Sequence, residues 1–310
     1  MKAYCVFKDF NLDACKIIEN AGIELILNKS DEKPNGENLV SILKEYDIII
    51  LSVFCKLTKE MIKHINKPII IATLSVGLDH IDESFFDSPF VKIVNIKTSN
   101  AISVAEHIFA LILSLNKRVF ESNKLVLEGK GVRGAIHQRP EDISGKVLGL
   151  IGCGNITQEV IKISQVFNMK LLCFTKNPNN HKDMINKGVK FVDLDYLLKE
   201  SDIINISVPL NNETKNLISK EKISLMKPSA TFINTSRSEV VDTNALIEYA
   251  DVNKQFYVGL DIDVDKYDNL KKYRENVVVT PHIAGITKQA VYRMDFEIVN
   301  KIIDLVKNQV

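Results

Sequence analysis

The sequence has almost no excess of charge. Its 310 residues include 40 lysines and arginines against 39 aspartates and glutamates, and the formal net charge at pH 7 is +1. This balance gives no attraction to polyanions, so we expect neither nucleic acid nor an anionic membrane surface as a partner. No apolar run has the length of a membrane-spanning helix, and the charged N-terminal segment does not resemble a secretion signal. We therefore expect a cytoplasmic protein that does not bind membranes.

Cysteine motifs are missing as well. The five cysteines are odd in number, have no C-x-x-C spacing and mostly lie inside apolar runs; they are Cys5, Cys15, Cys55, Cys153 and Cys173. Metal sites and disulfide frameworks have more regular cysteine spacings. We therefore predict buried, reduced thiols and no metal ion.

Short apolar runs that alternate with helical patterns make up most of the chain. Five runs, from AYCVF at residue 3 to VKIVNI at residue 91, precede one long helical pattern over residues 101–128. Six more runs follow, from KVLGLIG at residue 146 to NVVVTP at residue 276. Alternating strands and helices form parallel sheets. We predict an α/β protein with two doubly wound parallel-sheet domains, the second of the Rossmann type.

A last amphipathic helix is predicted from Thr287 to about Lys307. One of its faces is apolar and carries Val291, Met294, Ile298, Ile302 and Leu305. Such a face has to pack on another element. Because the helix directly follows the last strand, it could pack back on the first domain.

The second series of strands begins with a candidate nucleotide loop, VLGLIGCGNITQEV at residues 147–160. Gly152 permits a tight turn, and Gly154 lets the backbone approach a pyrophosphate at the N-terminus of a helix that begins near Asn155. Thr157 replaces the third glycine of the G-x-G-x-x-G pattern. That position serves mainly close packing of helix on strand, so a small residue can be accommodated. We predict a dinucleotide site rather than an ordinary strand–helix turn.

The end of the next strand, LLCFTKN, bears on the choice of cofactor. An acidic residue there would bind the ribose 2′-hydroxyl of NAD, but Thr175 occupies its place. Thr175 does not repel a 2′-phosphate, and the neighbouring Lys176 can attract one. We therefore predict NADP(H) as the preferred cofactor and NAD(H) as the alternative. The competing interpretation is that Lys176 is an ordinary solvated loop lysine.

Six further motifs occur in a characteristic order. They are SVGLDHID (75–82), SNAISVAEHIFALIL (99–113), SVPLNNETKNLIS (207–219), INTSRSEVVDTNALI (233–247), GLDI (259–262) and TPHIAGIT (280–287). Together they resemble the D-isomer-specific 2-hydroxyacid dehydrogenases, in particular glyoxylate and hydroxypyruvate reductases. The resemblance implies a flavodoxin-like substrate domain built from residues 1–98 and 286–310, with a Rossmann nucleotide-binding domain, residues 99–285, inserted between them. It also implies a small 2-oxo acid as substrate and a homodimer held by the long helix 101–128.

Two residues match the chemistry of this family by position. Arg237 in NTSRSEVVD matches the arginine that binds the substrate carboxylate and orients the 2-oxo group, which a guanidinium can do with a bidentate, charge-assisted pair. His282 in TPHIAG matches the general acid that protonates the carbonyl oxygen, and an imidazole has a pKa suited to that task. The alternatives are an exposed arginine near Asp242 and a hydrogen-bonded core histidine.

The resemblance also assigns binding residues. Val76 and Gly77 match the loop whose backbone amides hold the substrate carboxylate, and Asn100 matches the residue beside it. The positions that match cofactor contacts are Gly152, Gly154, Asn155, Ile156, Thr175, Lys176, Val208, Pro209, Thr214, Thr235, Ser236, Asp261, His282 and Ala284.

One position departs from the family pattern. The family usually has a glutamate five residues after the equivalent of Asp261, and this glutamate raises the pKa of the catalytic histidine. Lys266 stands at that place and would lower the pKa of His282 instead. The segment between Asp261 and His282 is short for the family, so a one-residue deletion would bring Asp265 into the glutamate's role. We predict Asp265 as the third catalytic residue; the alternative is a solvated loop aspartate. Ser238 also replaces the glycine that commonly follows the arginine.

Two functions are compatible with this pattern. The favoured one is an oxidoreductase that transfers a hydride between NAD(P)H and a small 2-oxo acid or D-2-hydroxy acid, such as glyoxylate or hydroxypyruvate. The other is a dehydrogenase-like protein that binds the cofactor as a sensor or a partner-binding dimer, with weak or lost catalysis. Loss of NADPH absorbance with a panel of 2-oxo acids would separate them, because only the enzyme oxidises the cofactor.

Overall fold

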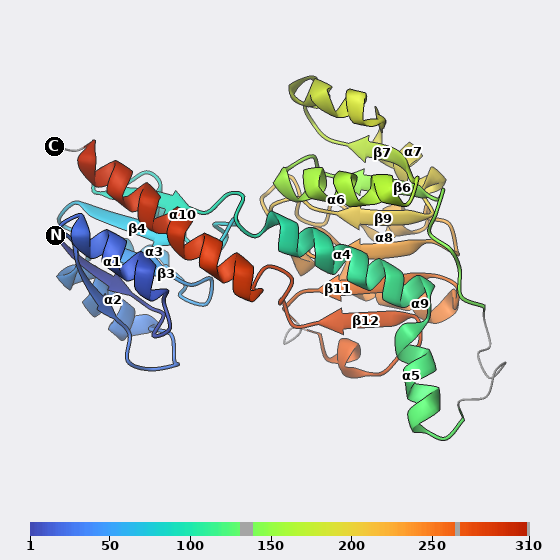
Figure 1. Ribbon diagram of the computed structural model, residues 1–310, viewed down its shortest axis with the longest axis horizontal. Helices are drawn as coiled ribbons and strands as arrows, with labels where there is room; N and C mark the ends of the chain where they lie inside the picture. The colour runs from blue at the N-terminus through green and yellow to red at the C-terminus, as the bar shows by residue number, and fades with distance from the viewer. Residues whose placement is uncertain (131–138, 264–266, 309–310) are drawn as a thin grey trace. The chain divides into compact units, whose positions relative to one another are not determined.

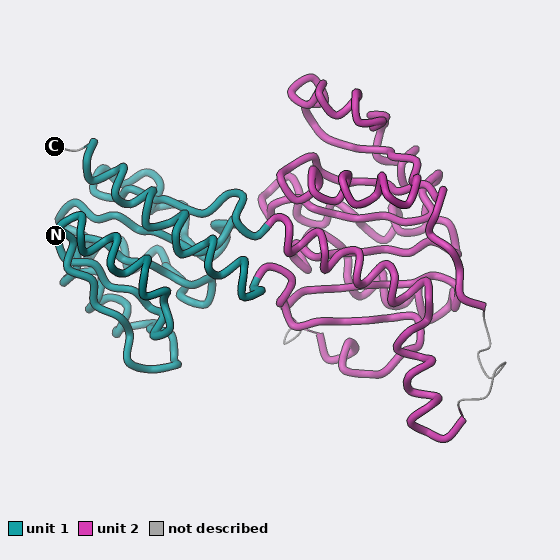
Figure 2. Tube along the Cα trace, viewed as in Figure 1, with its two compact units in different colours: residues 1–100, 286–310 teal, residues 101–285 magenta. Residues whose placement is uncertain are grey.

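The computed structural model describes residues 1–130, 139–263 and 267–308, which belong to two compact units. Unit 1 comprises residues 1–100 and 286–310, and unit 2 comprises residues 101–285 (Figure 2). The sequence analysis set the first boundary at residues 98 and 99. In the described ranges, no helix combines the length and the apolar character that a bilayer crossing needs.

Unit 1 is a parallel sheet of five strands in the order β2-β1-β3-β4-β5. The strands are β1 (Lys2–Cys5), β2 (Glu24–Leu27), β3 (Ile48–Leu51), β4 (Ile69–Thr73) and β5 (Val91–Asn95). The helices are α1 (Leu12–Asn20), α2 (Gly36–Glu45), α3 (Lys59–Ile62), η1 (Glu83–Phe85) and α10 (Lys288–Lys307). Figure 1 shows α1 and α10 side by side over the sheet, in blue and red.

Both faces of this sheet are covered, which explains its continuous apolar strands. In β3, Ile48 and Ile50 belong to the core formed with α1 and α10, whereas Ile49 and Leu51 belong to the core formed with α2 and α3. A strand with two buried faces has no polar alternation. The predicted C-terminal helix is confirmed: Thr287 caps it by accepting a hydrogen bond from the Ala290 N–H. Its apolar face packs in the core of unit 1, except that Val291, predicted on this face, is 37% exposed.

Unit 2 is a parallel sheet of seven strands in the order β12-β11-β10-β9-β6-β7-β8. The strands are β6 (Val147–Ile151), β7 (Lys170–Phe174), β8 (Val189–Phe191), β9 (Ile203–Ile206), β10 (Thr231–Asn234), β11 (Tyr257–Asp261) and β12 (Val277–Thr280). The helices are α4 (Ala101–Asn116), α5 (Val119–Leu127), α6 (Asn155–Val166), η2 (Pro178–Lys187), α7 (Leu194–Glu200), α8 (Lys220–Ile223), η3 (Ser238–Val240), α9 (Thr243–Val252) and η4 (Asp268–Lys271). The predicted class, two doubly wound parallel sheets, is confirmed.

The strand order of unit 2 reverses between β6 and β9. From β6 the chain builds outward through β7 and β8, and from β9 it builds outward in the other direction through β10, β11 and β12. Ligands of doubly wound sheets bind at the carboxyl ends of the strands where the order reverses. The edge strand β8 was not predicted, because only three residues form it and only Val189 among them is buried.

The predicted single helix over residues 101–128 is wrong. It is broken into α4 and α5 by Arg118, which has a left-handed backbone with φ 54°. Asn116 is buried and donates hydrogen bonds to the Ile112 carbonyl and to Thr231 Oγ1. The buried Arg118 guanidinium pairs with Glu121 and donates to the Tyr257 hydroxyl at 2.6 Å. These bonds tie the end of α4 to β10 and β11, so the helix cannot continue in a straight line.

Asp295 is a buried carboxyl in the core of unit 1. Its side chain lies on α10, the residue is 2% exposed, and its Oδ2 accepts a hydrogen bond from the Asn11 N–H at 3.1 Å. Burial raises the pKa of Asp295 from 3.8 to about 6, although that hydrogen bond opposes the shift. Desolvation therefore decides the sign of the shift.

We predict that Asp295→Asn stabilises the protein above pH 6. The folded carboxyl titrates near 6 and the unfolded one near 3.8, so stability is greatest below the lower value and falls as the pH rises through the higher one. Asparagine keeps an acceptor for Asn11 and removes the buried charge, so the free energy of unfolding at pH 8 should rise by about 1–3 kcal/mol. Urea unfolding at pH 4 and pH 8 checks this. The exposed Asp304→Asn variant on the same helix is the control, and no gain at pH 8 would contradict the prediction.

Candidate active site

The predicted residues of unit 2 that the structure describes lie at one edge of its sheet. They follow the carboxyl ends of β6, β7, β9 and β10, or lie at and just beyond the ends of β11 and β12. Because all strand pairs in this sheet are parallel, these ends share an edge. The edge includes the reversal point between β6 and β9, where a dinucleotide is expected.

The loop after β6 requires glycine at its first position. Gly152 has φ 100°, and a Cβ there would lie 2.4 Å from the Ser207 carbonyl oxygen and 2.9 Å from Val208 Cγ1. Gly154 is the N-cap residue of α6 and has no heavy atom within 4 Å of its Cβ position. The open space above Gly154 and the start of a twelve-residue helix fit a pyrophosphate. Asn155 and Ile156 begin that helix, and the side chain of Ile156 packs into the core beneath it.

Thr157 closes the loop through its hydroxyl group. The residue is fully buried, and its Oγ1 donates a hydrogen bond to the Gly152 carbonyl oxygen at 3.0 Å. A buried hydroxyl without a partner would destabilise the fold by about 1–3 kcal/mol. Here the group is satisfied by the loop itself. Threonine therefore replaces the third glycine with a bond between α6 and the loop.

The end of β7 carries Thr175 and Lys176. The Lys176 ammonium lies 2.5 Å from Oε2 of Glu213, and both side chains are more than half exposed. Glu213 comes from the loop after β9, where Thr214 donates to the Pro209 carbonyl and accepts from the Asn211 N–H. The two loops therefore meet beside the position expected for the cofactor ribose. Glu213 was not identified from the sequence.

Asn234 organises the loop after β10. Its Oδ1 accepts from the N–H and hydroxyl of Ser236, and its Nδ2 donates to the Arg237 carbonyl at 2.8 Å. Thr235 Oγ1 is buried and has no hydrogen-bond partner among the described residues. The Arg237 guanidinium donates to the Ser236 carbonyl at 3.1 Å. Ser238, which stands where the family has glycine, is buried and donates to Glu239.

The carboxylate of Asp261 holds the segment after β12. It is fully buried at the end of β11, where Oδ1 accepts from the Thr280 hydroxyl at 2.6 Å and from the Ile283 N–H at 2.8 Å. Oδ2 accepts from the Ala284 N–H at 2.8 Å. His107 of α4 lies 3.0 Å from Thr280 Oγ1 and 3.8 Å from Asp261 Oδ1. The Thr280 hydroxyl also lies 3.3 Å from the Leu260 carbonyl oxygen, but its shorter bond is to Asp261. With that proton directed to Asp261, Thr280 is left to accept from Nε2 of His107.

His282 lies inside the segment that Asp261 holds. Its backbone has φ 55°, and its N–H donates to the Thr280 carbonyl at 3.0 Å. A non-glycine residue in this region is strained by on the order of 1 kcal/mol. The hydrogen bonds that the next two amides, of Ile283 and Ala284, donate to Asp261 offset that strain. The half-buried imidazole is thus placed by a rigid turn at the carboxyl edge.

Unit 1 carries the remaining predicted residues at the carboxyl edge of its own sheet. Val76 and Gly77 follow β4, and Asn100 follows β5. The Val76 carbonyl accepts from Asn95 Nδ2 at 2.8 Å, and the Gly77 carbonyl accepts from Ser75 Oγ at 2.7 Å. Asn100 Oδ1 is buried and has no hydrogen-bond partner among the described residues.

Comparison with known proteins agrees with this geometry. The sequence model of the D-isomer specific 2-hydroxyacid dehydrogenase NAD binding domain matches residues 109–284. The chain belongs to the D-isomer-specific 2-hydroxyacid dehydrogenase family. It is accordingly an oxidoreductase of the 2-hydroxyacid class that uses a nicotinamide cofactor. Of the two functions compatible with the sequence, the enzymatic one agrees with this membership.

Three similar proteins illustrate the family. The hydroxypyruvate reductase of Thermotoga maritima is 32% identical over 295 residues, which cover 92% of this chain and 94% of the relative. The glyoxylate reductase of Thermococcus litoralis is 33% identical over 276 residues, with 86% and 82% covered. The solved structure of an acyclic imino acid reductase in complex with NADPH and D-Arg is 29% identical, with a TM-score of 0.87 and 99% and 98% of the two chains covered.

The prediction from the sequence and the structure of the dehydrogenase differ in coverage at four residues. Asp265 and Lys266 lie outside the described residues, so their relation to His282 stays a prediction. His107 and Thr280 were missed, because their role depends on a bond between residues 173 positions apart. The signal in the sequence was a histidine in the middle of a mostly apolar helix.

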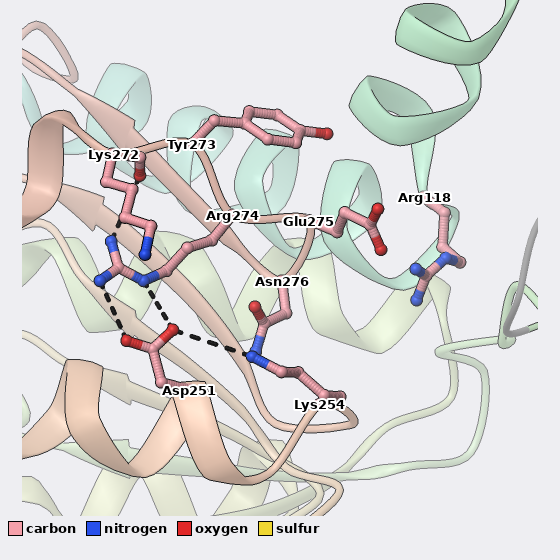
Figure 3. A pocket seen from close by; sticks show the side chains of 8 residues that line it. All are labelled: Arg118, Asp251, Lys254, Lys272, Tyr273, Arg274, Glu275 and Asn276. Carbon is pink, nitrogen blue, oxygen red and sulfur yellow. Dashed lines mark hydrogen bonds and ion pairs between the residues drawn. The ribbon is translucent and has the colours of Figure 1, made fainter.

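The dehydrogenase also has a pocket of about 370 Å³ at the opposite end of the unit 2 strands (Figure 3). Arg118, Asp251, Lys254, Lys272, Tyr273, Arg274, Glu275 and Asn276 line it, and all precede β11 or β12 or end α4. Arg274 forms a bidentate pair with Asp251, with distances of 2.8 and 3.0 Å. The Lys254 ammonium lies 3.8 Å from the same carboxylate. The Arg274 pair joins α9 to the segment before β12, which gives the pocket a structural role.

We predict that Asp261→Asn lowers both activity and stability. Asparagine has one acceptor oxygen, so its NH₂ group would face a backbone N–H or the Thr280 hydroxyl and leave the His282 turn loose. Loss of these buried bonds should destabilise the protein by about 2–4 kcal/mol and lower kcat at least about tenfold. Thermal unfolding and steady-state reduction measure the two effects. The exposed Asp268→Asn variant in η4 should change neither, and unaltered kcat in Asp261→Asn would refute the role of this carboxylate.

Proposed function

We propose that the enzyme reduces a small 2-oxo acid, such as glyoxylate or hydroxypyruvate, to the D-2-hydroxy acid with NADPH, and catalyses the reverse oxidation. The names of the Thermotoga and Thermococcus relatives support these substrates. When bound, the nicotinamide ring supplies the hydride for the carbonyl carbon. The chain's own residues bind the acid, orient it and deliver a proton to its oxygen.

The observation that carries this proposal is the hydrogen bonding of the loop after β4. Both carbonyl groups, of Val76 and Gly77, accept side-chain hydrogen bonds from within unit 1. Neither amide N–H donates to an acceptor in the part of the chain that the structure describes. Consecutive backbone amides without an internal acceptor are able to donate to an anion. A substrate carboxylate would therefore bind at residues 76 and 77, with Asn100 beside it.

We assign the second contact with the acid to Arg237. Its main chain is fixed by Asn234, and its planar guanidinium can bind a carboxylate and an adjacent oxo group together. His282 is the proton donor to the carbonyl oxygen. Asp265 supports the imidazolium, because a carboxylate stabilises the charged form that donates. A downward shift of the acidic pKa in the kcat profile of Asp265→Asn would support this assignment, and an unaltered profile would argue against it.

The preference for NADPH follows from Thr175 and Lys176. Thr175 removes the carboxylate that would repel a 2′-phosphate. The pair between Lys176 and Glu213 is exposed, and such pairs contribute about 0–1 kcal/mol. A phosphate can therefore displace Glu213 from Lys176. NADPH in the imino acid reductase complex shows that a similar fold binds this cofactor.

We further propose a cytoplasmic homodimer. The segment 101–128, which forms α4 and α5, exposes a group of apolar side chains. Their exposed fractions are 47% for Ile102, 50% for Val119, 51% for Phe120, 63% for Val126 and 79% for Leu127. A second copy would remove this apolar surface from water. Light scattering should give twice the chain mass of 35.0 kDa, and a monomer mass would exclude the dimer.

We predict that Arg237→Ala raises the KM for the 2-oxo acid and lowers kcat, because the guanidinium both binds and orients the substrate. A lost charge-assisted pair of about 1.5–3 kcal/mol corresponds to a loss in kcat/KM of about 10- to 160-fold. Arg237→Lys should recover part of the affinity but little of the orientation. NADPH binding, followed by fluorescence, should stay as in the wild type. Unchanged kinetics would remove Arg237 from the site.

We predict a preference for NADPH over NADH of at least about tenfold in kcat/KM, which corresponds to about 1.4 kcal/mol. Thr175→Asp should reverse it, and Lys176→Met should weaken it. Lys182→Met, an exposed lysine in η2, is the matched control and should have no effect. Glu213→Gln should strengthen the preference by releasing Lys176. A wild-type enzyme that uses NADH better would overturn the interpretation of Thr175 and Lys176.

A further inference from the structure

Two of the five cysteines meet at the nucleotide loop. Cys153 lies between Gly152 and Gly154, and Cys173 is the second-last residue of β7. The strands hold them together: Leu150 is opposite Cys173 in the sheet, and the Gly152 N–H donates to the Phe174 carbonyl at 2.9 Å. Cys173 Sγ lies 3.7 Å from the oxygen of Gly152, whose carbonyl carbon is bonded to the Cys153 nitrogen.

The two thiols lie close enough to influence each other and differ in acidity. The neighbouring Cys173 thiol lowers the pKa of Cys153, and the neighbouring Cys153 raises the pKa of Cys173. Burial raises both, and Cys173 is the more buried, with 0% exposed against 6% for Cys153. Cys153 also lies just before the N-terminus of α6, where the helix dipole favours an anion. Cys153 is therefore the sulfur that ionises and reacts first.

We propose that Cys153 and Cys173 are a modification site for peroxides, which convert the pair to a disulfide that prevents dinucleotide binding. The formation of the disulfide depends only on the two thiols. Its effect on the cofactor rests on the proposed role of Gly152 and Gly154 in holding the pyrophosphate.

The reaction needs one hydroperoxide and no other reagent. The Cys153 thiolate attacks an oxygen of hydrogen peroxide and breaks the O–O bond, which gives Cys153 sulfenic acid and one water after proton transfer. The Cys173 thiol then loses its proton, attacks the sulfenic sulfur and expels the second water. Two thiols are oxidised to one disulfide, and the peroxide is reduced to two waters. A thiol reductant reverses the change by exchange.

The disulfide would change the loop itself. It brings the sulfurs to about 2.05 Å, well inside the separation of two unbonded thiols, and one of the two residues, Cys153, is part of the loop. Gly152 is already packed against the Ser207 carbonyl, where a Cβ would lie 2.4 Å away. Movement of the loop is therefore directed to its open side, at Gly154 and the start of α6. That is the surface on which the pyrophosphate would lie.

The test compares NADPH binding to the full chain before and after hydrogen peroxide treatment. We expect peptide mapping to show a disulfide between Cys153 and Cys173, the Kd for NADPH to rise at least about tenfold, and dithiothreitol to restore it. Saturating NADPH should slow the oxidation. Cys153→Ala and Cys173→Ala should each show the same Kd before and after treatment, whereas Cys55→Ala, a buried cysteine of unit 1, should respond as the wild type.

Two results would overturn the proposal: no disulfide between these residues, or a complete disulfide with an unchanged Kd. A different result tests the proposed function. If the reduced protein does not bind NADPH, the cofactor assignment fails, while the peptide map still decides whether the disulfide forms.

Discussion

The carboxyl edge of the unit 2 sheet depends on one buried carboxylate. Asp261 ends β11 and accepts three hydrogen bonds, one from the hydroxyl of the last residue of β12 and two from backbone amides just after that strand. A buried charge is tolerated only when its oxygens are paired in this way. The bonds join neighbouring strands at their ends and fix the backbone of His282 in a region that side chains rarely occupy. The placement of the imidazole is thus a consequence of the charge beneath it.

The same carboxylate connects this edge to the helix beneath the sheet. His107 projects from α4 and donates to Thr280, which donates in turn to Asp261. α4 packs on β10, β11 and β12, so a polar chain runs from the covering helix to the turn that holds His282.

The sequence analysis predicted the elements whose signal is local. Apolar runs gave the strands of both sheets except β8, and the glycine spacing located the loop after β6, because these patterns depend on residues close in the chain. The break at Arg118 could not be found in this way. Asn116 and Arg118 are tolerated in a helix, and their partners Thr231 and Tyr257 lie 115 and 139 positions away. The support of His282 by Asp261, Thr280 and His107 has the same long-range character.

The loop after β6 shows how a departure from a motif can be compensated. The backbone of Gly152 is held on both sides. Its N–H donates to the Phe174 carbonyl, and its carbonyl accepts from Thr157 Oγ1 at 3.0 Å. The Thr157 bond comes from α6 and the Phe174 bond from β7, so the helix and the neighbouring strand both fix the turn. A third glycine would permit closer packing but would supply no such bond. With threonine, α6 packs less closely on the strand than it could with glycine, but a hydrogen bond joins the helix to the loop. The loop therefore keeps the shape that the first two glycines require.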